Sequence, residues 1–290
     1  GQAAAPRPVA LIRSIATVSS LTLLSRVLGF ARDMLIAALL GAGPLADAFF
    51  VAFKLPNFLR RLFAEGAFNA GFVPMFARTL EGEGRAAAKT FAEQAQAIQL
   101  AVLVPLVLVT MAAMPWVIAL MAPGFGFGSL RHTAAVEFSR ITFVYILFIA
   151  LVALYGGVLN SLGRFAAAAA SPILLNLSLI SALLIGALWF DAPADALAWG
   201  VAAGGLVQFL ALRLALRRAA MAPALRRPRL TPQIKRLFAL ILPGAIGAAS
   251  TTSASAAGTV RSSASSSARF WLYIASLTWP ARNWRAISGR

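Results

Sequence analysis

A long apolar segment with charged residues inside it constrains this chain more than any other feature. The segment runs from Ile15 to Leu40, which is long enough to cross a bilayer as a helix. At about 100° per residue, one polar stripe of roughly 120° contains five of its residues: Ser25, Arg26, Gly29, Arg32 and Asp33. Each ionised group near the middle of a membrane costs about 2.5–3.5 kcal/mol. We therefore expect the stripe to line a hydrated cavity that binds an anionic group.

The composition is that of an integral membrane protein. Hydrophobic residues make up 60% of the 290 residues and charged residues 12%, whereas soluble domains average about 25% charged residues. The chain has no cysteine, which excludes disulfides, thiol catalysis and zinc–thiolate sites. Its only histidine, His132, falls in a predicted loop, where we expect a surface residue and no metal site.

The net charge of +17 is distributed as in a membrane protein and not as in a nucleic-acid-binding protein. Most of the 26 basic residues lie in segments that we place on the cytoplasmic side, and Arg131 is the one in an outside loop. This asymmetry follows the positive-inside rule and predicts a cytoplasmic N-terminus. The basic loops should also contact anionic lipid headgroups.

We expect an all-α fold, a polytopic transmembrane helix bundle with one six-helix lobe and the start of a seventh helix. Each apolar run meets the length of about 20 residues that a bilayer requires. Turn residues and charged loops separate the runs. The predicted helices cover residues 11–40, 45–78, 88–121, 135–160, 170–190 and 195–219, and the seventh begins near residue 237.

Four parts are predicted along the chain. Residues 1–10 form a cytoplasmic tail, 11–219 the transmembrane lobe, 220–248 a basic cytoplasmic connection with the start of helix seven, and 249–290 an atypical tail. This last part is rich in serine and alanine and contains no acidic residue. We interpret it as a sequence that has shifted out of frame, and a natural linker is the alternative.

The second predicted helix adds another polar face. Asp47, Lys54 and Arg61 are spaced by seven residues, so they share one stripe. Asn57 and Arg60 flank this stripe, and Glu65 lies beyond it near the cytoplasmic end. Because a short turn joins the first two helices, we expect them to pack antiparallel, with their polar faces meeting each other or a shared cavity.

Two interpretations of these charges remain open. Buried ion pairs of Arg32 or Lys54 with Asp33 or Asp47 would hold the helices in register. The cations outnumber the acids, however, and a guanidinium group stays charged and matches phosphate bidentately. The surplus favours a ligand that carries phosphate or carboxylate groups.

Four motifs closely resemble the MurJ (MviN) family of lipid II flippases. They are SRVLGFARD at 25–33, DAFFVAFKLPN at 47–57, RRLFAEGAF at 60–68 and APGF at 122–125. The resemblance covers about residues 8–248 and lapses in the tail. It places the chain in the multidrug/oligosaccharidyl-lipid/polysaccharide (MOP) exporter superfamily, whose members alternate access between two lobes.

The resemblance implies transport of lipid-linked peptidoglycan precursor, lipid II, from the inner to the outer leaflet of the bacterial cytoplasmic (inner) membrane. It also implies roles for individual residues. Motif matching assigns substrate binding to Arg26, Arg32, Arg60, Ser25, Gly29 and Asn57, and functional cavity or gating charges to Asp33, Asp47, Lys54, Arg61 and Glu65.

The family's second lobe, with its further arginine and in some members a sodium site, has no counterpart in the chain. We therefore expect a truncated and inactive form, with no cofactor and no metal. The alternatives are a related MOP exporter of other polyprenyl-linked glycans, and a non-transport scaffold or half-transporter that works as a dimer. An enzyme is not expected, because the sequence shows no nucleophile–base pair or nucleotide loop.

Overall fold

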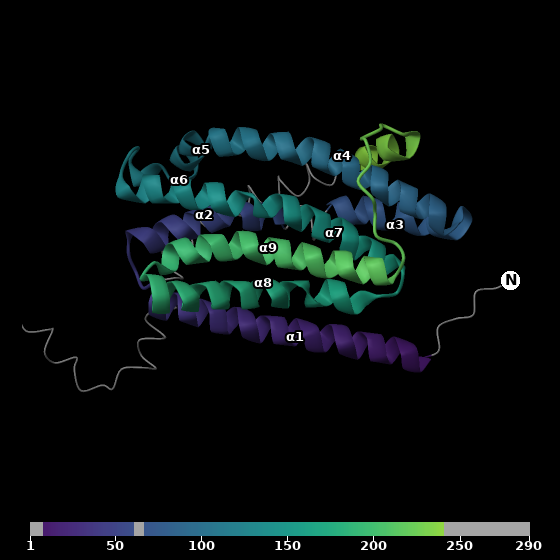
Figure 1. The fold of residues 1–290 in the computed structure, drawn as a ribbon, viewed down its shortest axis with the longest axis horizontal. Coiled ribbons are helices and arrows are strands. Elements are labelled where there is room, and N and C mark those ends of the chain that lie inside the picture. Colours follow the sequence, from purple (N-terminus) through teal and green to yellow (C-terminus); the bar gives the residue numbers. More distant parts are fainter. Residues whose placement is uncertain (1–7, 61–66, 241–290) are drawn as a thin grey trace, which may run out of the picture. The chain divides into compact units, whose positions relative to one another are not determined.

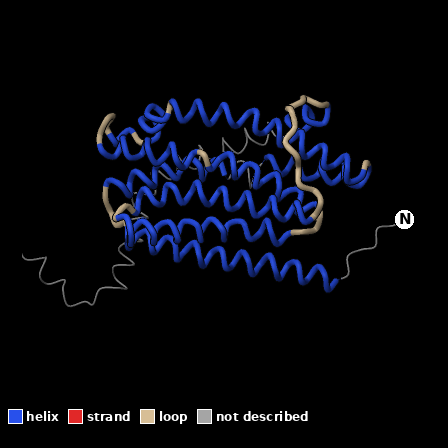
Figure 2. The backbone as a smooth tube through the Cα atoms, viewed as in Figure 1, coloured by secondary structure: helices blue, strands red, loops and turns tan. Residues whose placement is uncertain are grey.

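A computed structural model describes residues 8–60 and 67–240, and this part of the chain is helical throughout apart from its turns and one extended segment (Figures 1 and 2). A further helix at 232–240 follows the extended segment. The elements are α1 (Pro8–Leu39), α2 (Pro44–Arg60), α3 (Ala67–Gly82), α4 (Gly84–Ala112), α5 (Met114–Met121), η2 (Pro123–Phe125), α6 (Leu130–Phe143), α7 (Tyr145–Ser161), α8 (Phe165–Ile185), the π-helical turn η3 (Gly186–Phe190) and α9 (Pro193–Arg218).

The predicted helices exist, but several of them are divided. The one at 88–121 separates at Ala113 into α4 and α5, and Pro115 occupies the first turn of α5. A proline costs little there, because the first N–H groups of a helix have no partner within it. The helix predicted at 135–160 begins earlier and consists of α6 and α7, which meet at Val144.

Within the described residues, four helices are long and apolar enough to cross a membrane. They are Gly84–Ala112, Leu130–Ser161, Phe165–Phe190 and Pro193–Arg218. The α1 helix has 32 residues but is not among the four. That α1 crosses the membrane therefore stays a prediction, as does the six-helix lobe.

The first two helices do not pack against each other as we expected. The α1 helix lies along α8, and α2 packs mainly against α6 (Figure 1). The short turn at Gly41 brings the end of one helix close to the start of the other. It does not determine which faces meet, and α1 contacts α8 whereas α2 contacts α6. The prediction of direct antiparallel packing was therefore wrong.

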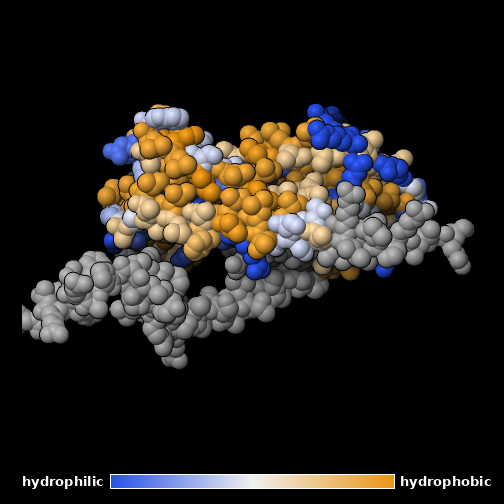
Figure 3. Space-filling model, turned by 90° about the horizontal axis from the view of Figure 1, so that it is seen from below, coloured by the Kyte–Doolittle hydropathy of each residue, from blue (hydrophilic) through white to orange (hydrophobic). Residues whose placement is uncertain are grey.

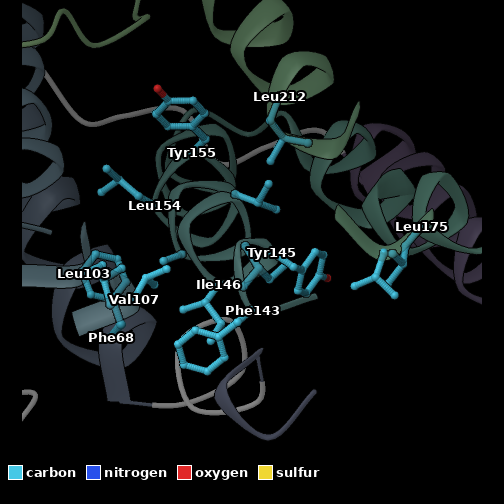
Figure 4. Close-up of a cluster of buried hydrophobic side chains, with 14 of the residues drawn as sticks. Phe68, Leu103, Val107, Phe143, Tyr145, Ile146, Leu154, Tyr155, Leu175 and Leu212 are labelled. Carbon is cyan, nitrogen blue, oxygen red and sulfur yellow. The ribbon is translucent and has the colours of Figure 1, made fainter. Parts of the chain in front are cut away.

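The core of the described bundle surrounds α7. Its side chains point outward in every direction, and Tyr145, Ile146, Leu154 and Tyr155 are all fully buried (Figure 4). A helix that is apolar on all sides belongs in an interior. The α9 helix approaches closely, since a Cβ on Gly205 would lie 2.6 Å from a ring carbon of Tyr145.

The outer surface matches a lipid environment. Hydrophobic side chains cover the middle of the face in Figure 3, and the largest group of hydrophilic side chains lies toward one end. Exposed leucine, phenylalanine and tryptophan side chains are frequent on the described helices. A soluble monomer rarely exposes such continuous apolar area.

His132 is not the surface loop residue that we expected. It lies in the first turn of α6 and is 5% exposed. Its Nδ1 accepts from the N–H of Gly128, and its Nε2 lies 3.0 Å from the carbonyl oxygen of Pro115. The ring is therefore buried, and its two contacts link the turn before α6 to α5.

Hydrogen bonds and an ion pair hold the basic connection after α9, residues 219–230, against α4. Glu93, whose side chain is 3% exposed, pairs with Arg226 and accepts from the N–H of Ala224. Gln94 accepts from the N–H of Arg229, and Arg85 donates to the carbonyl oxygen of Ala219. These bonds determine the path of residues 219–230 across the end of the bundle.

Candidate functional site

A polar cavity of about 440 Å³ lies inside the helix bundle, between α1, α2, α3, α7, α8 and α9. Amide and hydroxyl side chains dominate its polar lining, and Arg32 is the only ionised side chain among its described lining residues. The neutral polar lining consists of Asn57, Asn69, Asn160, Asn176, Gln208, Ser171 and Tyr145. Such a site can hold water and hydrogen-bond a polar ligand.

Arg32 combines an ion pair with free donor capacity. Its Nε and Nη2 donate to Oδ1 of Asp33 at 2.9 and 2.7 Å, and its Nη1 donates to Oδ1 of Asn176 at 2.8 Å. A guanidinium has five N–H donors, so these three bonds leave donors for a ligand. The side chain of Asp33 is 65% exposed, so water screens the pair and its energy is small.

Asn176 connects α8 to α1 and orients Arg32. Its Nδ2 donates to the carbonyl oxygen of Ser25 at 3.0 Å, while its Oδ1 accepts from Arg32. Gly29 lies beside it, and a Cβ there would sit 3.6 Å from Nδ2, which is an ordinary contact. Ser25 thus contributes its backbone to the site, and position 29 has room for a Cβ without moving the two helices apart.

Gln208 adds a buried polar group on the opposite wall. Its Nε2 donates to the carbonyl oxygen and the hydroxyl of Ser171, at 2.8 and 3.0 Å. Its Oε1 is buried and has no hydrogen-bond partner among the described residues. An acceptor in this state favours a donor from water or a ligand in the cavity.

The predicted cations do not all meet at the cavity. Gly29, Arg32 and Asn57 line it, as expected, whereas Arg26 and Lys54 are exposed and do not. Arg26 makes no hydrogen bond or ion pair within the described ranges, so it is not neutralised by a neighbouring acid there. Arg60 is the last residue of α2, and Arg61 and Glu65 lie outside the described residues.

Asp47 lies away from the cavity, in the first turn of α2. Its carboxylate pairs with Arg131 of α6 at 3.3 Å, and both side chains are about half exposed. The expectation of buried ion pairs between helices is not met. Arg32 pairs with Asp33, but the two are neighbours in one helix and Asp33 is exposed, and Asp47 pairs with Arg131 instead of Arg32 or Lys54. The pair joins the ends of α2 and α6 where we expect the outside surface.

Asn176 and Gln208 were missed by the sequence analysis. Both lie on helices that looked like ordinary apolar spans, and both are buried. An uncharged amide inside a span was the available signal, since buried amides require hydrogen-bond partners. Only the packing of α8 and α9 around the cavity distinguishes these residues from other polar positions.

The chain matches the family model "Lipid II flippase MurJ" over residues 36–280, which extends past residue 248, where we expected the resemblance to end. It is 45% identical over 244 residues to the probable lipid II flippase MurJ of Rhizobium meliloti (strain 1021). It is 40% identical over 237 residues to the lipid II flippase MurJ of Burkholderia cenocepacia. These alignments cover 82% and 80% of this chain but 45% and 46% of the relatives. The chain thus spans less than half the length of these curated relatives.

Solved structures show the same fold. The chain is similar to the lipid II flippase MurJ in an inward closed conformation, with a TM-score of 0.62 and 24% identity over 80% of this chain and 47% of that one. It also matches a MOP superfamily transporter from Pyrococcus furiosus, with a TM-score of 0.66 and 17% identity over 82% and 53%. At these identities the likeness concerns the fold alone. It confirms the all-α fold class.

Proposed function

Because the chain belongs to the MurJ family of lipid II flippases, we propose that its cavity binds the polar headgroup of lipid II during transfer across the bacterial cytoplasmic membrane. The supporting observation is Arg32, a guanidinium with unused donors beside an internal polar cavity in a transmembrane-type bundle. A polyprenyl diphosphate headgroup needs this combination of a cation and neutral hydrogen-bonding groups, while its tail stays in lipid.

The lining residues suggest different roles for the charged and the neutral side chains. Arg32 would bind a diphosphate oxygen with its remaining donors, because arginine pairs bidentately with phosphate. Asparagine and glutamine side chains, which both donate and accept, would bind the sugar and peptide groups. Exposed Arg26 would meet the diphosphate before it enters. Arg60 completes the proposed set of binding arginines, with Ser25, Gly29 and Asn57 beside them.

The other charges are proposed to act in gating. Asp33 holds Arg32 through a screened pair that an incoming diphosphate can replace. Asp47 and Arg131 would join two helix ends in one state of the transport cycle. Lys54, Arg61 and Glu65 would contribute on the second polar face. Each role requires different contacts in the two access states.

Transport requires the second half of the protein. We infer that residues 11–219 form one lobe, that 220–248 connect it to the next helices, and that the N-terminus is cytoplasmic. Alternating access in such transporters rocks two repeats about a central site. The function is transport and not catalysis, so the cavity residues bind and release but do not react. A MOP exporter of other polyprenyl-linked glycans would use the same diphosphate contacts.

Binding in nanodiscs tests the proposal on this chain. We expect lipid II to bind the unchanged chain, and Arg32→Ala to weaken the affinity at least about tenfold, because it removes a charge-assisted bond. Arg227→Ala is the matched control, since Arg227 is exposed on the connection and is not among the residues that line the cavity. Equal affinities for the Arg32→Ala and Arg227→Ala variants would contradict the assignment.

Undecaprenyl diphosphate without sugar separates the two ligand classes. We expect it to bind more weakly than lipid II, because it leaves the amide lining unused. Another lipid-linked oligosaccharide that binds as tightly as lipid II would favour the more general exporter.

A further inference from the structure

A second, apolar groove lies between α8 and α9, outside the polar cavity. Its volume is about 790 Å³, within the usual range of ligand pockets. Six large apolar residues and four alanines form most of its lining, with one glycine, two serines and one acid. Both helices are long and apolar enough to cross a membrane, so we expect the groove to face lipid chains.

Close backbone contacts shape the groove. At its floor, a Cβ on Gly200 would lie 2.6 Å from Cβ of Ala182, so α8 and α9 touch there. At one end, the π-helical turn η3 closes it, and a Cβ on Gly186 would lie only 2.3 Å from Cβ of Ala196. Short π-helical segments inside α-helices are rare and are frequent at functional sites.

The charge at the closed end of the groove is negative. Asp191 and Asp195 are the only charged residues between Arg164 and Arg213, in a chain whose net charge is +17. Asp195 lines the groove in the first turn of α9 and makes no ion pair within the described part of the chain. The N-terminus of α9 contributes about half a positive charge, which is less than the full charge of this carboxylate.

An aromatic surface lies one turn further along α9. Trp199 also lines the groove, and its side chain is 63% exposed. The face of an indole ring attracts ammonium groups. The groove therefore presents an apolar channel, a carboxylate and an indole at one end, and no basic side chain among its described lining residues.

We propose that this groove binds a phospholipid whose headgroup carries an ammonium group, such as phosphatidylethanolamine, with an acyl chain between α8 and α9 and the ammonium at Asp195 and Trp199. Anionic phospholipids without an ammonium group are disfavoured there, because Asp195 repels them. The site is separate from the polar cavity, and the proposal does not depend on lipid II binding.

Trp199 provides the test. In the full chain, Trp116, Trp189, Trp271, Trp279 and Trp284 are replaced by phenylalanine, which leaves Trp199 as the only tryptophan. The protein is placed in nanodiscs that contain brominated phosphatidylethanolamine or brominated phosphatidylglycerol at equal fractions. We expect the apparent affinity for the ethanolamine lipid to be at least about threefold higher than that for the glycerol lipid. A modest cation–π or ion-pair contact predicts a difference of this size.

Three variants separate the causes. Asp195→Asn should abolish the preference. Asp191→Asn is the matched control, because Asp191 does not line the groove and asparagine tolerates its φ of 49°. Ala203→Phe, at an exposed position on the groove wall, should reduce quenching by both lipids. Circular dichroism checks that each variant keeps its helices.

Equal quenching by the two lipids, or a preference that survives Asp195→Asn, would overturn the proposal and leave only the ordinary lipid layer around the protein. Unchanged quenching in the Ala203→Phe variant would show that no acyl chain occupies the groove, which also overturns it.

Discussion

At the scale of single residues, the balance between Arg32 and its neighbours decides whether the cavity can bind an anion. Asp33 neutralises Arg32 only partly, since the carboxylate is mostly exposed to solvent. Asn176 holds Nη1 in place without charge. A neutral orienting group leaves the cation available, whereas a second buried carboxylate would compete with a phosphate ligand.

Replacing Asn176 should therefore affect both structure and binding. Asn176→Leu keeps similar volume but leaves the carbonyl oxygen of Ser25 and one donor of Arg32 unpaired. We expect a loss of about 1–3 kcal/mol in unfolding free energy and weaker lipid II binding. Denaturant unfolding in mild detergent and binding in nanodiscs measure the two effects.

Asn160→Leu is the control for this substitution, because Asn160 lines the same cavity but is exposed, and its side chain makes no hydrogen bond within the described ranges. If the two variants lose equal stability, the bridge from α8 to α1 does not contribute as we describe.

At the scale of elements, close approach between helices depends on small residues at particular contacts. A Cβ at position 205 would overlap the Tyr145 ring, so α7 and α9 would have to separate. Gly205→Ala should destabilise the bundle by about 1–3 kcal/mol, as overpacking usually does. Thermal unfolding compares it with Gly124→Ala, where a Cβ would meet nothing within 4 Å. An unchanged melting temperature for Gly205→Ala would refute this packing.

The connection after α9 depends on one buried carboxylate. Arg226→Ala would leave Glu93 buried without its cation, whereas Glu93→Gln removes the charge and retains an acceptor for Ala224. We expect Arg226→Ala to be less stable than Glu93→Gln, because a buried charge without a partner costs about several kcal/mol. The rate at which a protease cleaves residues 219–230 measures the stability of the connection. Arg227→Ala serves as the exposed control. Faster cleavage of Glu93→Gln than of Arg226→Ala would contradict the order.

At the scale of the whole molecule, the distribution of charge predicts orientation in the membrane. Arg227 should face the cytoplasm and Gly124 the outside. Because the chain lacks cysteine, Arg227→Cys and Gly124→Cys each introduce a single label site. We expect a membrane-impermeant maleimide added to intact cells to label position 124 and not 227. The reverse pattern would invert the proposed topology.

Helix positions were largely accessible from the sequence because apolar runs of bilayer length and their separating turns are local features. The helical breaks at Ala113 and Val144 were not recognised. Pro115 within an apolar run does not reveal where one helix ends, and no proline marks the break at Val144. Gly29, Arg32 and Asn57 line the cavity, on the polar faces that helical periodicity gives them, and their role in binding stays a prediction. Lys54, on the same predicted face as Asn57, does not line it.

The sequence by itself determined the membrane class, the polar stripe of the first helix and the family, all of which depend on composition and on short motifs. Only the tertiary structure decided that α1 packs on α8, that Asn176 and Gln208 enter the cavity, and that Asp47 pairs with Arg131. The physical reason is that a helix repeats its faces within a few residues, so local sequence defines each face. The partner of that face comes from residues far away in the sequence, 144 positions for Arg32 with Asn176, and the fit depends on the packing of the whole bundle.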